Sequence, residues 1–320
     1  MSVIAPVDVH DDTALKAWYA VEAASMAFDR PYASHRTFEA LANSVRMPHD
    51  HGRRVLLAAK EQGETIGIAE LDLPEEERSH VVELGIHVLP VHRWRGVGTE
   101  LWRAADDVRR TSGRTLTTAE VTIPPKSSLA FARALGFKSV RREDHLAADL
   151  PLPHKPFNVL GYELLMWEDR TPEDLLAQFV GLRNQMGKEM PGKTEQDMVA
   201  HTADRIRSAE KSTARSYDRI TAAAREILTG ELVGYSVIFL AHGSDEAIQD
   251  DTFVKSAHRG HKLGLALKVA TLAAVQRNHP ERTSIHTWTD PSNDVMQRIN
   301  KQFGFRKIEL MHEVQRTDRW

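Results

Sequence analysis

The chain has 320 residues, of which 41% are hydrophobic and 27% are charged, and its formal net charge at pH 7 is −3. This length is about twice that of a typical domain and the composition is ordinary for a globular protein, so we expect two domains of roughly 150 residues. The small net charge gives no reason to expect nucleic acid as a partner. The lack of cysteine excludes disulfides, thiolate metal sites and a cysteine acyl-enzyme.

The sequence predicts neither a metal site nor a membrane segment. None of the 16 histidines stands in the His-x-x-x-His spacing of a helical metal site. No apolar run reaches the length of a membrane span, and residues 1–6 lack the basic stretch of a signal sequence. We therefore expect a cytoplasmic protein, monomeric or homodimeric, with no metal and no membrane partner.

The first half of the chain mixes β-rich runs with amphipathic runs of helical period. Asp11 to Thr13 supply a helix start. In chain order we expect a strand over 3–9, helices over 14–28 and 35–44, a hairpin over 54–60 and 64–73, a strand over 81–89, a helix over 98–111, a strand over 114–122, a helix over 127–135, and a hairpin to about 150.

Residues 151–158 hold three prolines, which favour extended chain. We therefore predict domains over 1–150 and 159–320, joined by a linker over 151–158. The order of elements then repeats: a strand over 162–167, a helix after Thr171, a helix over 194–212, and strands over 215–226, 231–242 and 247–255. Strands and helices in this order predict an α/β fold, a mixed sheet with helices on both faces.

One short segment occurs twice. Residues 88–98 align without gaps on residues 254–264, and each copy closes further on with a Gly-Phe step, Gly136-Phe137 and Gly304-Phe305. The repeat indicates that one fold unit is duplicated.

A strand that runs through a glycine turn into a helix can bind phosphate. The first helical N–H groups have no partner within the helix and lie at the positive end of its dipole. Small residues let a pyrophosphate approach the backbone, and neighbouring Arg or His adds charge. The alternative is that Gly96 and Gly98 only make a tight turn, but the preceding strand, the following helix and the second copy favour phosphate.

Arg93 to Gly98 fits the Arg/Gln-x-x-Gly-x-Gly/Ala signature of the GNAT superfamily of acyl-CoA-dependent N-acyltransferases, which this segment resembles. The Leu135-Gly136-Phe137 step also lies where that family places it. The resemblance covers nearly the whole chain as two tandem domains, and the second half looks like that of actinobacterial tandem members.

The resemblance implies two GNAT-like domains, each with a mixed, mostly antiparallel sheet flanked by helices. It also implies acetyl-CoA or another acyl-CoA as donor, with pantetheine pairing along the strand that ends at the Val and pyrophosphate on the loop. The cofactor-binding residues expected are Val88, Arg93, Trp94, Arg95, Gly96, Val97, Gly98 and Thr99 in the first copy, and Val254, His258, Arg259, Gly260, His261, Lys262, Leu263, Gly264 and Asn293 in the second.

The two copies depart from the family pattern in different places. Lys262 replaces Gly96, which is acceptable if its φ stays negative; the alternative is that the second loop has lost its ligand. The family often has Asn eleven residues before the Gly of the Gly-Phe step, contacting pantetheine, and Tyr four before it, protonating the thiolate. The second copy has Asn293 and Asn300 at these positions, whereas the first has Pro125 and Ala132.

Three residues are candidates for the chemistry: Glu83, Asp251 and Asn300. A carboxylate or His must accept the proton of an attacking amine. Glu83 lies opposite the apolar face of its strand, and Asp251 would share a face with Gln249 unless a bulge shifts the register. Alternatively, Glu83 is an ordinary surface carboxylate and Asp251 pairs with a nearby Arg.

The function predicted is acyl-CoA-dependent N-acylation, most simply direct transfer of acetyl to an amine of a small molecule. One domain is expected to carry the chemistry, with the second favoured for acceptor contacts. Residues 186–192 and the helix with Arg205, Arg207 and Glu210 occupy the expected acceptor region, or are a loop and a charged solvent-facing helix. Alternatives are a non-catalytic CoA-binding regulator and a transferase that uses a carrier protein or aminoacyl-tRNA as donor.

Overall fold

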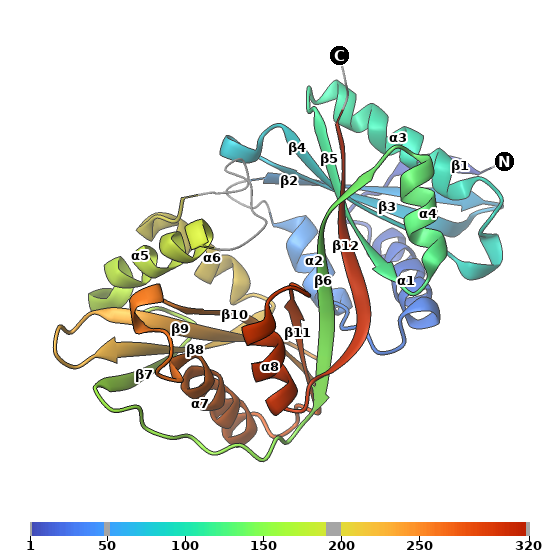
Figure 1. Ribbon diagram of the computed structural model, residues 1–320. Helices are drawn as coiled ribbons and strands as arrows, with labels where there is room; N and C mark the ends of the chain where they lie inside the picture. The colour runs from blue at the N-terminus through green and yellow to red at the C-terminus, as the bar shows by residue number, and fades with distance from the viewer. Residues whose placement is uncertain (1, 48–51, 190–199, 318–320) are drawn as a thin grey trace. The chain divides into compact units, whose positions relative to one another are not determined.

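The computed structural model describes residues 2–47, 52–189 and 200–317. The chain divides into two compact units: unit 1 is Met1–Asp144 with Ile308–Trp320, and unit 2 is His145–Lys307 (Figure 1). No helix in the described ranges is long and apolar enough to cross a lipid bilayer.

Unit 1 has a sheet in the order β1-β2-β3-β4-β5-β12-β6. Strands β4 and β5 are parallel, whereas β1–β2, β2–β3, β3–β4 and β5–β12 are antiparallel. The elements are β1 (Val3–Pro6), α1 (Asp12–Asp29), α2 (Phe38–Arg46), β2 (Gly52–Glu61), β3 (Glu64–Pro74), η1 (Glu76–Arg78), β4 (Val81–Val88), η2 (Pro90–His92), α3 (Val97–Thr111), β5 (Leu116–Ile123), α4 (Lys126–Ala134), β6 (Lys138–Asp149) and β12 (Arg306–Thr317).

Helices cover both faces of this sheet because its strands are apolar on both sides. On one face α1 and α2 pack through Leu15, Trp18 and Leu41 onto the strands. On the other face α3 packs through Val97 and Leu101. The predicted start of α1 is confirmed, since the side chain of Asp11 accepts hydrogen bonds from the first-turn N–H groups.

Unit 2 repeats this plan with a sheet in the order β6-β11-β10-β9-β8-β7. Strands β10 and β11 are parallel, whereas β7–β8, β8–β9 and β9–β10 are antiparallel. Its own elements are β7 (Tyr162–Glu168), α5 (Glu173–Glu189), α6 (Ala203–Thr213), β8 (Tyr217–Glu226), β9 (Leu232–Ala241), β10 (Glu246–Val254), η4 (Ser256–His258), α7 (Leu263–Asn278), β11 (Ser284–Thr289) and α8 (Asp294–Gln302).

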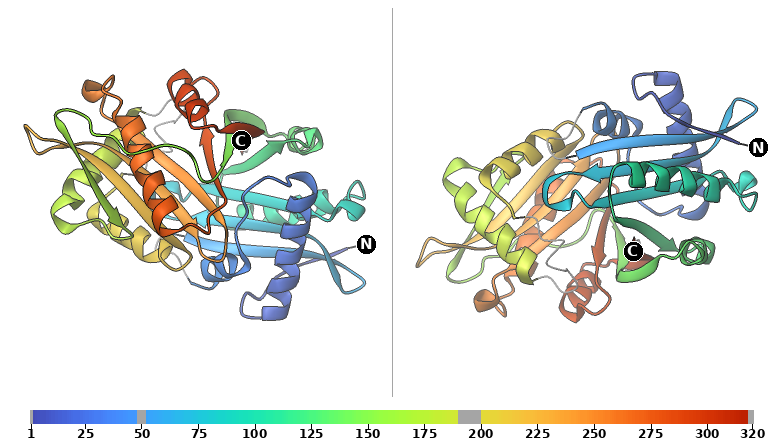
Figure 2. Two further views of the ribbon diagram at one scale, coloured as in Figure 1. Left: turned by 90° about the horizontal axis from the view of Figure 1, so that it is seen from below. Right: turned by 90° about the horizontal axis from the view of Figure 1, so that it is seen from above.

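Helix α7 is buried along most of its length. It lies along the strands of its own unit, as the left panel of Figure 2 shows, and its Leu263, Leu267 and Val269 belong to the cores beneath it. On the opposite face α5 packs through Phe179 and Leu182 onto Tyr235. The α/β fold expected from the sequence, with mixed sheets between helices, is confirmed.

The predicted hairpin that ends near residue 150 is wrong. Residues 138–149 form one continuous strand, β6, which lies in the sheet next to β12 from the far end of the chain. The second half of β6 belongs to unit 2, and most of β12 belongs to unit 1. The units thus divide the chain differently from the predicted boundary at 151–158.

Most other predicted elements lie within a few residues of the observed ones. The largest shift is in α6, which begins at Ala203 after its N-cap Thr202, whereas the predicted helix begins at 194. Residues 194–199 of that prediction lie outside the described residues, as do 190–192 of the predicted acceptor loop.

Candidate active site

In each unit the parallel pair of strands separates after three residue pairs. Strand β4 pairs with β5 over Val81–Glu83, and β10 pairs with β11 over Glu246–Ile248. The rest of β4 and β10, residues 84–88 and 249–254, lies past the end of these parallel ladders. A strand edge of this kind can pair with an extended, amide-bearing ligand.

The loops after β4 and β10 have the same internal construction. Each begins with a 3-10 turn, η2 or η4. In the first loop Arg93 Nε donates to Val88 O at 2.9 Å, and in the second Arg259 Nε donates to Val254 O at 3.0 Å. The structure therefore confirms the alignment of the two segments, including its register.

Each loop places two residues in the left-handed region. In the first loop these are Trp94 and Gly96, with φ of 61° and 88°; in the second they are Gly260 and Lys262, with φ of 88° and 63°. Each loop therefore has one glycine and one other residue at these positions, in opposite order. The requirement that φ of Lys262 stay negative is not met.

Replacing Lys262 by Gly is expected to raise the free energy of unfolding by up to about 1 kcal/mol, because a non-glycine residue in the left-handed region is strained by about that amount. Equilibrium urea denaturation measures the change. The matched variant Gly96→Ala places a Cβ at the equivalent position and is expected to lower stability by a similar amount, although nothing lies within 4 Å of that Cβ. Equal stability of the Lys262→Gly variant and the native chain would contradict the assignment of strain.

Each loop leads directly into a helix whose first residue is buried. Val97 at the start of α3 and Leu263 at the start of α7 are 6% and 2% exposed. Their side chains anchor the helix end in the core, so what they can offer a ligand is their main chain. The unpaired first-turn N–H groups and the helix dipole make both ends suitable for an anion.

A glycine in each unit lies where a side chain would clash, with the start of α3 in unit 1 and with strand β10 in unit 2, and sequence reasoning missed both. Gly67 on β3 pairs with Val88, and Gly234 on β9 pairs with Val254. A Cβ at 67 would lie 2.9 Å from a Val97 side-chain carbon, and one at 234 would lie 2.8 Å from the carbonyl oxygen of Phe253. An isolated glycine within a predicted strand was the available signal, because it often marks a close approach of backbone.

The charged side chains of the first loop are largely engaged with other protein groups. Arg93 also contacts Asp29 at 2.7 Å and Ser25 at 3.0 Å, so its guanidinium ties the loop to the end of α1. Arg95 is half exposed and lies 3.2 Å from Glu61. Trp94 is 90% exposed and therefore does not cover the turn.

The second loop has a parallel set of contacts. His258 Nδ1 lies 3.0 Å from the hydroxyl of Tyr162, whose ring also contacts that of His261. Arg259 forms an ion pair with Glu189 and is half exposed, and Lys262 is exposed. The second loop thus keeps cationic groups at its surface even though it has Lys262 in place of Gly96.

Comparisons with known proteins agree with this geometry. Residues 15–137 match the model of the acetyltransferase (GNAT) family. A tandem GNAT protein from the clavulanic acid biosynthesis pathway, solved without acetyl-CoA, is 25% identical with a TM-score of 0.83 and covers 99% of this chain and 98% of its own. Residues 15–137 thus carry a GNAT domain, and the whole chain is similar to a tandem GNAT protein.

Two more distant structures share the fold of this chain. A GCN5-related N-acetyltransferase from Sphaerobacter thermophilus is 17% identical with a TM-score of 0.74, covering 99% of this chain and 95% of its own. A putative acetyltransferase from Pyrococcus horikoshii is 11% identical with a TM-score of 0.59, covering 99% and 90%. No curated protein matches the chain. The fold is that of acyl-CoA-dependent acyltransferases.

The two units differ in the strand that leads to the loop. The β3–β4 pairing runs without interruption from Gly67–Val88 to Asp72–Glu83. The β9–β10 pairing shifts register between Gln249 and Thr252, so β10 has a bulge just past the end of its ladder with β11. Bulges re-aim side chains and occur often beside active sites.

The bulge separates two side chains that simple alternation places on one face. Gln249 is buried and donates to Ser236 Oγ at 3.1 Å, whose hydroxyl also contacts Thr252. Asp251 lies instead beside Arg183 of α5, 2.6 Å from its guanidinium, with the hydroxyl of Tyr235 at 3.4 Å. The bulge that the sequence analysis left open is therefore present, and it removes the shared face that simple alternation gives Gln249 and Asp251.

Both carboxylates singled out as bases are ion-paired. Asp251 pairs with Arg183, and Glu83 pairs with Arg78 at 2.7 Å with its side chain 45% exposed. Burial lowers the pKa of Arg183, but the neighbouring Tyr235 and Asp251 raise it by more. The pKa of Arg183 therefore lies above its ordinary value. Both carboxylates therefore already have a cationic partner within the protein.

The two asparagines of the second unit have structural partners. Asn293 is the N-cap of α8, its side chain accepting from the N–H of Met296 at 3.2 Å. Asn300 is 1% exposed: its Oδ1 accepts from Lys268 Nζ at 3.1 Å and its Nδ2 donates to Thr289 at 2.9 Å. Sequence reasoning found Asn300 but not the lysine behind it.

The helix expected to border the acceptor is also tied into the protein. Glu210 of α6 is buried and contacts Arg207 at 2.6 Å and Arg219 at 2.8 Å. Its Oε1 also accepts from the N–H of Thr171 at 2.9 Å. Glu210 therefore joins α6 to β8 and to the segment before α5.

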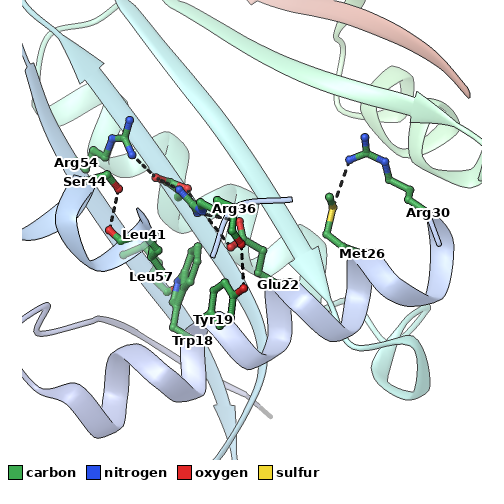
Figure 3. Close-up of polar contacts among 11 residues, drawn as sticks. Trp18, Tyr19, Glu22, Met26, Arg30, Arg36, Leu41, Ser44, Arg54 and Leu57 are labelled. Carbon is green, nitrogen blue, oxygen red and sulfur yellow. Dashed lines mark hydrogen bonds and ion pairs between the residues drawn. The ribbon is translucent and has the colours of Figure 1, made fainter. Parts of the chain in front are cut away.

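Unit 1 contains a charged network beside α1 that the sequence did not reveal (Figure 3). Arg36, between α1 and α2, contacts Glu22 at 2.8 Å and Glu70 of β3 at 2.6 Å. Arg54 lies 3.4 Å from Glu70, and Tyr19 donates to the carbonyl of Arg36. This network lies on the sheet face opposite α3.

Next to this network His87 of β4 is held neutral. Burial, followed by the nearby cations Arg30 and Arg36, lowers the pKa of His87 to about 4. On the neighbouring strand, burial and the carboxylates Glu143 and Glu83 raise the pKa of Glu120. In residues 2–47, 52–189 and 200–317 no group of three or more His, Asp or Glu side chains is placed to hold a metal ion.

Proposed function

We propose that this protein is an acyl-CoA-dependent N-acyltransferase that moves acetyl from acetyl-CoA to an amine of a small molecule by direct attack. Unit 2 carries the transfer, and unit 1 binds acyl-CoA or supports the fold. The observation that carries the proposal is the bulge in β10, where the strand leaves its ladder with β11 and runs toward an anion-binding helix start.

The residues present suit such a donor. The free edge of β10 can pair with the amides of pantetheine, and the start of α7 with Lys262 and Arg259 can hold the pyrophosphate. Backbone N–H groups beside the bulge can donate to the oxygen of the thioester as negative charge develops. Asp251, held beside Arg183, orients the amine, and the proton of the amine leaves through water.

Isothermal titration with acetyl-CoA and with CoA tests the donor, and turnover over a panel of amines tests the transfer. Micromolar binding together with turnover of at least one amine supports the proposal. Absence of CoA binding at high micromolar concentration would remove it.

Replacing Asp251 by Asn is expected to lower kcat/KM about tenfold, with acetyl-CoA affinity unchanged, because the group that orients the amine loses its charge. The matched variant Glu83→Gln in unit 1 is expected to leave kcat/KM unchanged. Steady-state kinetics with the preferred amine measures both. The opposite pattern, with Glu83→Gln impaired and Asp251→Asn normal, would move the chemistry to unit 1.

A second function has a specific observation behind it. Because Asp251 and Glu83 are both ion-paired, neither unit presents a free carboxylate among the bases singled out from the sequence. This favours a regulator that binds CoA without turnover. Binding with no transfer from acetyl-CoA to any amine would support that function, whereas transfer only from a charged carrier protein or aminoacyl-tRNA would identify a different donor.

A further inference from the structure

Three polar side chains form a hydrogen-bonded chain inside unit 2. Lys268 of α7 donates to Oδ1 of Asn300 on α8 at 3.1 Å, and Nδ2 of Asn300 donates to Oγ1 of Thr289 on β11 at 2.9 Å. The three residues are 3%, 1% and 6% exposed. The chain therefore crosses from one helix to the other and then to the sheet without reaching solvent.

Unit 1 has no such chain at the equivalent places. The loop alignment pairs Lys268 with residue 102, and the Gly-Phe alignment pairs Thr289 and Asn300 with residues 121 and 132. All three equivalents belong to the apolar core of unit 1: Trp102, Val121 and Ala132. The same fold is thus built with apolar residues at these three positions, and the fold itself does not require the polar chain.

The polar version is costly to bury. An ammonium group has three donors, whereas Lys268 has one acceptor, Asn300, and burial alone lowers the pKa of Lys268 to about 7. The charged side chains of the packed elements lie elsewhere: Asp294, Arg298 and Lys301 of α8 are exposed. On the strands, Asp251 forms an ion pair with Arg183. His286 lies three residues before Thr289 in β11, so its side chain is on the opposite face of that strand.

The chain ends where the proposed donor would lie. Pairing of β10 with β11 stops at His286, so Thr289, three residues later, lies on the part of β11 past the ladder. A hydroxyl has one donor and two acceptor sites. Since Asn300 occupies an acceptor site of Thr289, the O–H proton is available for another acceptor.

We propose that Thr289 stabilises the leaving thiolate in unit 2 by donating a hydrogen bond to its sulfur, and that Lys268 and Asn300 are positioning residues that orient and polarise this donor. The proposal rests on the function proposed above and adds the group that replaces the missing tyrosine. Successive hydrogen bonds strengthen one another inside a protein, so the ammonium at the far end makes Thr289 a better donor.

The step balances without another reactant. The amine nitrogen forms a bond to the carbonyl carbon, the carbon–sulfur bond breaks, and sulfur leaves with the electron pair as a thiolate. Thr289 keeps its proton while it donates to that sulfur. The proton that the nitrogen loses passes through water and finally neutralises the thiolate.

The test uses full-length variants and CoA itself as the probe. Bound CoA is titrated from pH 5 to 10 while thiolate absorbance is followed, which reports the pKa of its thiol without any acceptor. With the native protein the thiol is expected to titrate at least about one pH unit below free CoA. Thr289→Val is expected to remove that difference, and Lys268→Met is expected to reduce it, because Lys268 has lost part of its charge at the pH of this titration. Thr289→Ser retains the hydroxyl and is expected to keep it.

Rates provide a second measurement. Thr289→Val is expected to slow acetyl transfer about 100-fold, because removing one hydrogen-bond donor to the charge that develops in a transition state typically has an effect of that size. The ratio of native to Lys268→Met rates is expected to fall as pH rises from 6 to 8.5, because Lys268 then loses its proton. Thr271→Val is the matched control, because Thr271 is another buried polar residue of α7 and its hydroxyl donates only to carbonyl groups of its own helix. This variant is expected to change neither the transfer rate, at any pH, nor the titration of the bound thiol.

Stability separates this role from a structural one. Because burial lowers the pKa of Lys268, native stability rises with pH between about 7 and 10.5, where the unfolded chain binds the extra proton. Lys268→Met is therefore expected to raise Tm by roughly 3 °C or more at pH 6, with a smaller gain at pH 10.

The outcomes distinguish the two proposals. If CoA does not bind, the proposed function fails. If CoA binds and its thiol titrates alike in native, Lys268→Met and Thr289→Val proteins, the role of this chain is overturned while the function stands. A lower Tm for Lys268→Met would likewise show that the chain serves the fold.

Discussion

Replacing Arg36 by Met is expected to lower the free energy of unfolding by about 3–5 kcal/mol at neutral pH, because it leaves two largely buried carboxylates without their shared cation. Glu22 and Glu70 are 15% and 19% exposed, and both contact the Arg36 guanidinium. Urea denaturation at pH 7 measures the loss.

The effect of pH on this variant has a definite sign. Burial raises the pKa of Glu70, but the charge and hydrogen bond of Arg36 outweigh burial and leave it below the ordinary value. Glu70 therefore stabilises the native protein above about pH 4.5, and this contribution is lost as pH falls. When Arg36 is removed, burial raises the pKa of Glu70, so the Arg36→Met protein loses least stability in acid, where Glu70 is protonated. The difference in free energy of unfolding between the native protein and Arg36→Met is therefore expected to narrow as pH falls from 7 to 4.

Glu22 behaves differently and sharpens the test. Burial outweighs Arg36 there and raises the pKa of Glu22, so this carboxylate destabilises the native protein as pH rises through that pKa. The triple variant Arg36→Met, Glu22→Gln, Glu70→Gln is expected to recover much of the loss at pH 7. A loss below 1 kcal/mol for Arg36→Met alone, equal at pH 4 and 7, would show that the network contributes little.

Replacing Gly264 by Leu is expected to weaken acetyl-CoA binding by unit 2 at least about 100-fold. This factor corresponds to the loss of two charge-assisted hydrogen bonds between the pyrophosphate and the N–H groups at the start of α7. Residue 264 is the second residue of α7, and a leucine side chain there fills the space through which a pyrophosphate approaches the first-turn N–H groups. A Cβ at 264 lies 3.9 Å from its nearest neighbours, the side chains of Thr252 and Val254, so the fold tolerates it. Isothermal titration measures affinity and stoichiometry.

The matched variant in unit 1 separates the two loops. In Gly98→Leu the new Cβ lies 3.3 Å from the ring of Phe131, so this variant is expected to cost stability as well as affinity. If both units bind acetyl-CoA, each variant removes one site and leaves the other. Unchanged affinity in the folded Gly264→Leu protein would rule out the start of α7 as the pyrophosphate site.

The sequence alone determined the repeated module, the fold and the resemblance to the GNAT family, because these rest on local signals. The spacing of His258 and Arg259 before α7 reproduces that of His92 and Arg93 before α3, and helix starts and glycine turns are set by neighbouring residues. Local signals also marked Asn300 and the two adjacent aspartates of β10. The isolated glycines 67 and 234 were legible in principle, as sites of close approach.

The tertiary structure decided what depends on residues far apart in the chain. Only the folded structure shows that β12 completes unit 1, that β10 is bulged against β9, and that Asp251 meets Arg183 across 68 positions. Likewise, the φ of Lys262 and the burial of Lys268 against Asn300 follow from packing, which overrides what each residue type prefers on its own. A one-residue shift in a strand moves a side chain to the other face, so the sequence could name the candidates of the site but could not say which of them share it.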